Sequence, residues 1–116
     1  MAIRIVQNLN AQQEEVRLPI RIHLTQVLAS NRDSEQVQIV YTLNDDHDVW
    51  FDGPTKTVTR TETIGRAQTP IEHRLKLVHA AGDDIERPTI RQTITDSQGI
   101  QTTDRTSVTV LPEDGQ

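Results

Sequence analysis

The chain has 116 residues, a formal net charge of −5 at pH 7 and no cysteine. This length corresponds to about one domain, so we expect a single domain over residues 1–116, with residues 113–116 forming a disordered tail. The lack of cysteine excludes disulfides, thiolate nucleophiles and cysteine-based metal centres, and the negative charge disfavours nucleic acid as a partner.

The first apolar patterns have the period of a β-strand. Residues 3–6 predict a short first strand that ends at Asn8 and Asn10. Residues 16–24 give the clearest signal, because every second side chain is apolar: Val16, Leu18, Ile20, Ile22 and Leu24. Pro19 lacks a backbone N–H, which predicts an edge position or a bulge in this strand.

The pattern changes after residue 24 and then returns. The spacing of Leu24, Val27 and Leu28 predicts one helical turn, and residues 31–34 predict a loop. Residues 36–43 predict another strand, with alternate apolar side chains at Val37, Ile39, Tyr41 and Leu43. A polar loop is expected at residues 44–48.

The middle of the chain holds two of its three aromatic residues, Trp50 and Phe51. We expect Val49 and Phe51 to share one face of a short strand, with Trp50 on the other face. Gly53 and Pro54 then predict a turn. Residues 55–64 are rich in β-branched side chains but poor in large apolar groups, which favours a strand at a sheet edge.

The last third repeats strands and turns at short intervals. After a connection at residues 65–70, we expect strands at residues 71–78, 89–95 and 100–111, separated by turns at 81–84 and 96–99. Ile71, Leu75 and Leu77 are predicted to point inward. The whole pattern indicates an all-β protein, an antiparallel β-sandwich of about seven strands with an aliphatic core.

Three short stretches resemble bacterial immunoglobulin-like and fibronectin type III-like modules. They are Val40-Tyr41-Thr42-Leu43, the hairpin at residues 95–99 and the closing stretch at residues 106–110. This resemblance implies an immunoglobulin-like sandwich, although the chain has no cysteine pair. A shared fold does not define a function.

Residues 44–48 contain the densest group of candidate metal ligands. Asp45, Asp46 and Asp48 supply oxygens of the kind that calcium prefers, and Asp83 with Asp84 could join them from another loop. The spacing does not match an EF-hand, and a solvated turn capped by its own side chains is the alternative. We expect no metal site here. His73 and His79 lie too far apart on one strand to share an ion, and His73 is expected to be a hydrogen-bonded residue of the core or its rim.

The remaining candidate contacts lie at residues 50–63. Thr55, Thr57, Thr59, Thr61 and Thr63 project from one side of a predicted edge strand, which is typical of a solvent-exposed face. An edge strand also offers unpaired backbone groups for strand addition by a partner or a second copy. Trp50 and Phe51 are candidates for a contact with protein or carbohydrate.

No catalytic motif is recognisable, because no serine has a nucleophile-elbow sequence and no glycine-rich phosphate loop exists. We therefore expect a non-enzymatic structural or protein-interaction module without a cofactor, whose binding residues are Trp50, Phe51, Asp45, Asp46, Asp48, Thr57, Thr59 and Thr61. The alternative is a calcium- or carbohydrate-binding β-sandwich module. The expected partner is a protein, including self-association through an edge strand.

The sequence places few limits on the compartment. No apolar run approaches the roughly 20 residues that span a bilayer, so we expect no membrane insertion. The first residues lack the apolar segment and cleavage site of a signal peptide. The chain is therefore expected to be either cytoplasmic or a module of a longer exported protein.

Overall fold

The computed structural model describes residues 3–15, 19–44, 49–79 and 85–111, which form strands and no helix. The eight strands are β1 (Ile3–Gln13), β2 (Ile20–Ser30), β3 (Glu35–Leu43), β4 (Val49–Phe51), β5 (Thr57–Ile64), β6 (Thr69–His79), β7 (Thr89–Thr95) and β8 (Gln101–Ser107). Within these residues no helix is long and apolar enough to cross a membrane.

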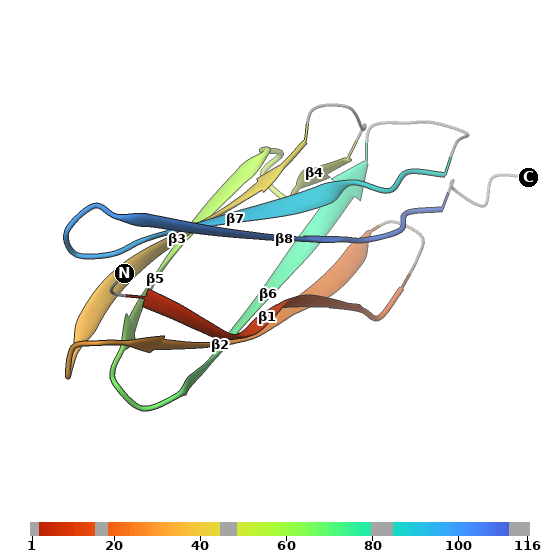
Figure 1. Ribbon diagram of the computed structural model, residues 1–116. Coiled ribbons are helices and arrows are strands. Elements are labelled where there is room, and N and C mark those ends of the chain that lie inside the picture. The colour runs from red at the N-terminus through yellow and green to blue at the C-terminus, as the bar shows by residue number, and fades with distance from the viewer. Residues whose placement is uncertain (1–2, 16–18, 45–48, 80–84, 112–116) are drawn as a thin grey trace, which may run out of the picture.

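The strands build two four-stranded antiparallel sheets that face each other (Figure 1). The first sheet has the order β1-β2-β6-β4, and the second sheet has the order β5-β3-β7-β8. All of the ladders are antiparallel. The predicted all-β antiparallel sandwich is therefore confirmed, with eight strands where about seven were expected.

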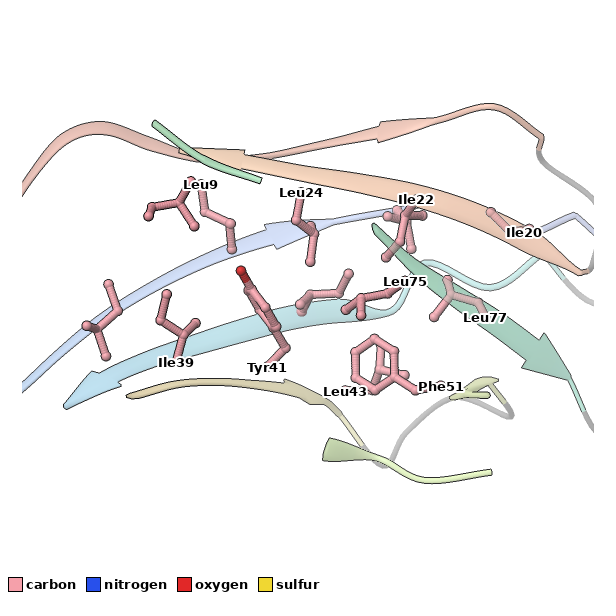
Figure 2. Close-up of a cluster of buried hydrophobic side chains, with 14 of the residues drawn as sticks. Leu9, Ile20, Ile22, Leu24, Ile39, Tyr41, Leu43, Phe51, Leu75 and Leu77 are labelled. Atoms are coloured by element: carbon pink, nitrogen blue, oxygen red, sulfur yellow. The ribbon is translucent and has the colours of Figure 1, made fainter. Parts of the chain in front are cut away.

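The core between the sheets is mainly aliphatic. Alternate side chains of β2, β3, β6 and β7 point inward, and Figure 2 shows several of them around Tyr41 and Phe51. These two are the only aromatic side chains in the core cluster. Ile71, Leu75 and Leu77 are buried, as the alternation predicted.

Two predictions for the first strands are wrong. β1 continues past Asn8 and Asn10 to Gln13, since register shifts between Ile5 and Gln7 and between Gln7 and Asn10 keep it paired with β2. Residues 24–28 form no helical turn, because β2 runs to Ser30 and pairs with β1 on one side and β6 on the other. Ladder pairing on both sides overrides the local helical spacing.

The prediction for Pro19 is also wrong. Pro19 lies immediately before β2, and β2 is an internal strand. A proline in that place removes no donor from the ladder, so neither an edge position nor a bulge is needed. Val16 and Leu18 of the same predicted strand lie outside the described residues.

The later elements follow the prediction with shifted ends. β6 begins at Thr69, and β8 ends at Ser107, after which Val110 forms an isolated bridge with Glu86. The turn at residues 96–99 is confirmed: the Asp96 carboxylate accepts hydrogen bonds from two backbone N–H groups beyond it, and Gly99 has a positive φ of 83°. The predicted turn at residues 81–84 and the tail at 113–116 lie outside the described residues.

One side of the sandwich is closed by side chains. Asp104 of β8 accepts hydrogen bonds from the Leu9 backbone N–H at 2.8 Å and from the Asn8 amide at 3.2 Å. The Gln13 side chain pairs with the backbone of Thr109, donating to its carbonyl at 2.8 Å and accepting from its N–H at 3.0 Å. The edges of β1 and β8 are therefore linked, which leaves β5 and the short β4 as the edges of the opposite side.

Candidate interaction site at the β5 edge

β5 is an edge strand, as its composition predicted. Its ladder with β3 runs without a bulge from Glu35 opposite Ile64 to Thr42 opposite Thr57. The Leu43 N–H donates to the Lys56 carbonyl at 2.8 Å, one step beyond that ladder. Hydrogen-bonded positions alternate in an antiparallel ladder, so Val58 and every second residue after it direct their backbone groups toward β3.

The same alternation turns the backbone groups of the threonines to the free edge. Two observations agree with this assignment. The Thr55 hydroxyl contacts both the N–H and the carbonyl of Thr57, at 3.3 and 3.2 Å. The Arg60 guanidinium donates to the Thr59 carbonyl at 3.0 Å. Local side chains therefore cover the first half of the free edge.

The open part of the edge is short. At its far end, the Gly65 carbonyl accepts a hydrogen bond of 2.8 Å from the Ser30 N–H at the end of β2. Between Arg60 and Gly65, no described residue forms a hydrogen bond with the outward-facing backbone groups of Thr61 or Thr63. These two residues therefore present N–H donors and carbonyl acceptors in the arrangement that a further strand requires.

The two faces of β5 differ in chemistry. Thr57, Thr59, Thr61 and Thr63 are all exposed on the outer face. On the inner face, Glu62 is half-buried while Ile64 is buried in the core. The predicted threonine row thus occupies the exposed surface of an edge strand.

The threonine row also belongs to a wider array that the sequence analysis did not recognise. The register places Thr59, Val40, Thr93 and Thr103 in one row across the second sheet, and Thr61, Gln38, Thr95 and Gln101 in the next. The outer face of the second sheet is therefore rich in hydroxyl and amide groups and has no charge in these two rows. Only a known register would have revealed this, because the four strands are distant in sequence.

The outer face of the first sheet is different, because it is largely basic. Arg21 lies opposite Lys76 and His23 lies opposite Arg74 in the β2–β6 ladder, beside a hollow of about 710 Å³. Arg21 and Lys76 are directly opposed like charges, which destabilise a sheet. Glu72 Oε1 lies 3.2 Å from His23 Nε2.

Trp50 and Phe51 occupy opposite faces of β4, as predicted, but only one of them is accessible. Phe51 is 1% exposed and packs in the core, so a surface contact through Phe51 does not fit the structure. Trp50 is half-buried, and the Lys56 ammonium lies 4.6 Å from its ring centroid. Lys56 also donates to the Val49 carbonyl at 2.8 Å, which fixes the cation over the indole.

The structure does not test the predicted acidic contacts. Asp45, Asp46 and Asp48 lie outside the described residues, as do Asp83 and Asp84. Among residues 3–15, 19–44, 49–79 and 85–111, no group of three or more His, Asp or Glu side chains is arranged to hold a metal ion.

A buried polar chain crosses the core, and its pairing was not predictable from sequence. Tyr41 Oη lies 2.7 Å from His73 Nδ1, and His73 Nε2 lies 2.6 Å from Glu62 Oε2. Burial raises the pKa of Tyr41 well above its ordinary value, and the Glu62 carboxylate adds to this effect. Tyr41 therefore stays protonated, and its hydroxyl pairs with Nδ1 while Nε2 pairs with the carboxylate.

The hydrogen-bonded series Tyr41–His73–Glu62 resembles a catalytic relay only in the order of its hydroxyl, imidazole and carboxylate groups. Tyr41 is 0% exposed, so no substrate reaches its hydroxyl. His73 is 8% exposed and hydrogen-bonded at both ring nitrogens, as expected of a hydrogen-bonded histidine in the core or at its rim. The arrangement links β3, β6 and β5, and it holds Glu62 against the first sheet.

A second buried acid anchors the opposite end of β3. The Glu35 side chain is 0% exposed and accepts hydrogen bonds from the Ser30 hydroxyl at 2.5 Å and from the Ser97 hydroxyl and N–H at 2.8 and 3.1 Å. The bond from Ser30 lowers the pKa of Glu35 below its ordinary value; burial opposes this shift, while the bonds from Ser97 and the charge of Arg32 reinforce it. The ionised carboxylate thus ties the β2–β3 hairpin to the β7–β8 turn.

Acidification is expected to remove the stability that this carboxylate contributes. A lowered folded-state pKa stabilises the fold above the ordinary glutamate pKa, and this contribution is lost as the pH falls through the folded value. We therefore expect Glu35→Gln to lower the free energy of unfolding by about 1–3 kcal/mol at pH 7. The difference from wild type should shrink below about pH 4. Urea titrations from pH 7 to pH 3 measure this stability difference, with the exposed residue change Glu72→Gln as control. A difference between wild type and Glu35→Gln that does not depend on pH would contradict the stabilising role of the ionised Glu35 carboxylate.

The comparisons with known proteins add no family. No family model matches the chain, and no curated protein matches it. Among solved structures, the sporulation control protein Spo0M from Bacillus subtilis is similar with a TM-score of 0.41 and 10% sequence identity, over 97% of this chain and 51% of that one. The chain thus spans about half the length of that protein.

Proposed function

We propose that this protein is a non-enzymatic protein-interaction module, an immunoglobulin-like sandwich that binds a partner by strand addition at β5. The observation that carries the proposal is the short open edge at Thr61 and Thr63, between the Arg60–Thr59 contact and the Ser30–Gly65 bond. Main-chain hydrogen bonds supply affinity in strand addition, and neighbouring side chains supply selectivity.

The surroundings of the edge support this function. Interface centres are depleted in charge, and the exposed threonines of β5 continue into the uncharged rows of the second sheet. The opposite side of the sandwich is linked by Asp104 and Gln13, which leaves fewer free backbone groups there. Trp50 belongs to β4, the edge strand of the first sheet on the same side, and its ring contacts Lys56 just before β5.

A strand-forming peptide tests this proposal directly. We expect a capped peptide of alternating threonine and valine to shift the amide resonances of Thr59, Thr61 and Thr63 with an affinity of about 1 mM, which is weak because few residues pair. Thr103 on β8 should not respond. Nuclear magnetic resonance titration measures both effects.

A matched variant separates strand addition from adhesion to the threonine face. Thr61→Pro removes one N–H at the free edge while the β3 ladder keeps its bonds, so it should abolish the shifts. Thr103→Pro, placed on the other edge of the same sheet, should leave peptide binding unchanged. Equal binding by both variants, or shifts centred on β8, would refute strand addition at β5.

A further inference from the structure

We infer that the β5 edge pairs with the β5 edge of a second copy of this chain, in an antiparallel register centred on Thr61. This inference rests on the proposed function and names the occupant of the same edge. Three features select this partner and this register: which backbone groups are free, which side chains would oppose each other, and where the edge is already covered.

The free backbone groups define the centre of the pairing. In an antiparallel pair, residues that exchange both hydrogen bonds alternate along the strand. Only the odd-numbered residues of β5 direct their groups outward, so the two-fold axis lies either at one of them or at the even-numbered residue between two of them. An axis at Arg60 or Glu62 would place like charges directly opposite each other, which destabilises a strand pair. The Thr55 hydroxyl occupies the Thr57 groups, and Ser30 occupies the Gly65 carbonyl. An axis at Thr61 uses Thr59, Thr61 and Thr63 and avoids both covered ends.

The inner face of β5 is self-complementary in this register. When Thr61 faces Thr61 of the second copy, Arg60 of each chain lies directly opposite Glu62 of the other. Opposite charges in directly opposed positions stabilise a strand pair. Moving the axis by two residues toward the end of β5 would place Glu62 opposite Ile64, which offers no such complement.

The present contacts of both charged side chains are compatible with this exchange. Glu62 bonds His73 through Oε2, and its Oε1 has no hydrogen bond within the described part of the chain. The Glu62 side chain is 33% exposed, so a cation of the second copy can reach it. Arg60 is exposed and covers the Thr59 carbonyl in the single copy. Moving Arg60 onto the partner carboxylate uncovers that carbonyl for the N–H of Thr63 of the second copy.

Arg60 therefore has two states with opposite consequences. In the single copy its guanidinium blocks one acceptor of the edge, as charged side chains do on many edge strands. In the pair it supplies the contact that fixes the register. Pairing five residues of each chain buries less surface than the roughly 1,000 Å² that a stable complex needs. We therefore expect a weak dimer that forms at about 0.1–1 mM protein.

Complementary charge variants test the register. Arg60→Glu leaves only acids at the two opposed positions, and Glu62→Arg leaves only bases. Each variant alone should therefore associate about tenfold more weakly than wild type. An equal mixture of the two should restore association. In a mixed pair, one chain has acids at positions 60 and 62 and the other has bases at both, so opposite charges face each other at both contacts. Sedimentation velocity over a concentration series measures each case.

Two controls keep the result specific. Arg105→Glu makes the same charge change on β8 and should dimerise like wild type. Circular dichroism melting checks that each variant folds, since Glu62→Arg removes the His73 contact. If that variant does not fold, Thr61→Pro provides the test, and it should abolish the dimer. Hydrogen exchange should show protection of the Thr59, Thr61 and Thr63 amides in concentrated wild-type protein.

The outcomes separate this inference from the proposed function. Wild-type protein that stays monomeric at 1 mM, or a dimer that Arg60→Glu leaves unchanged, would overturn self-pairing. The mixture failing to associate while both variants fold would overturn it too. In any of these cases, peptide binding at Thr61 would leave strand addition standing with a different partner, and no peptide binding would remove both.

Discussion

Replacement of Phe51 by alanine is expected to lower the free energy of unfolding by about 3–5 kcal/mol. Phe51 is 1% exposed and lies opposite Leu77 in the β4–β6 ladder. It and Tyr41 are the only aromatic side chains in the core cluster, so aliphatic neighbours cannot fill the space that the substitution leaves. β4 has three residues, which gives it few other bonds to hold its place.

The neighbouring residue provides a matched control. Trp50→Ala should cost about 1 kcal/mol, because Trp50 is half-buried and mainly loses the cation–π contact with Lys56. Urea denaturation followed by circular dichroism measures both variants, since Trp50 is the only tryptophan and its fluorescence is lost with it. A larger effect for Trp50→Ala than for Phe51→Ala would mean that the faces of β4 are reversed.

The strand pattern of the fold was largely predictable because burial on one face imposes a period of two. This period located β3, β6 and β7 and assigned Phe51 and Trp50 to opposite faces. It failed at residues 24–28, where the apolar spacing fits a helix as well as a strand. Only the ladders to β1 and β6 decide in favour of the strand, and such pairing is not a local property.

The candidate site was predictable as a strand but not as an edge with defined open groups. β-branched composition with few large apolar residues identified residues 55–64 as an edge. Which threonines present their backbone to the outside depends on the register with β3, which no local pattern encodes. The contact of Arg60 with Thr59 and the position of Gly65 beside Ser30 likewise depend on the folded structure.

The buried polar residues show the same limit. Gln92 fell between two apolar positions in the sequence, and its partner Gln26 lies 66 residues away. Tyr41 and His73 are 32 residues apart. Both pairs join the first sheet to the second, so a shift of either sheet would leave buried polar atoms without partners. Such pairs favour one relative position of the sheets, whereas an entirely aliphatic interface would tolerate several.

The Gln26–Gln92 pair is therefore expected to show strong coupling between its two members. Gln26 is 3% exposed and Gln92 is 0% exposed, and their amides bond each other in both directions, with Gln92 Nε2 donating to Gln26 Oε1 at 2.8 Å. Either single change to leucine should cost about 1–3 kcal/mol, because the remaining amide loses its bonds to the other amide and keeps its desolvation penalty. The double change removes both polar groups and should cost less than the sum.

A double-mutant cycle in urea measures this coupling as the difference between the double variant and the two singles. We expect a coupling energy of about 1–2 kcal/mol that favours the double variant. A matched cycle at Ile22 and Ile94, one on each sheet and both already apolar, controls for changes in packing alone. Additive costs at Gln26 and Gln92 would mean that water or another group satisfies each amide separately. The pair would then have no role in setting the position of one sheet against the other.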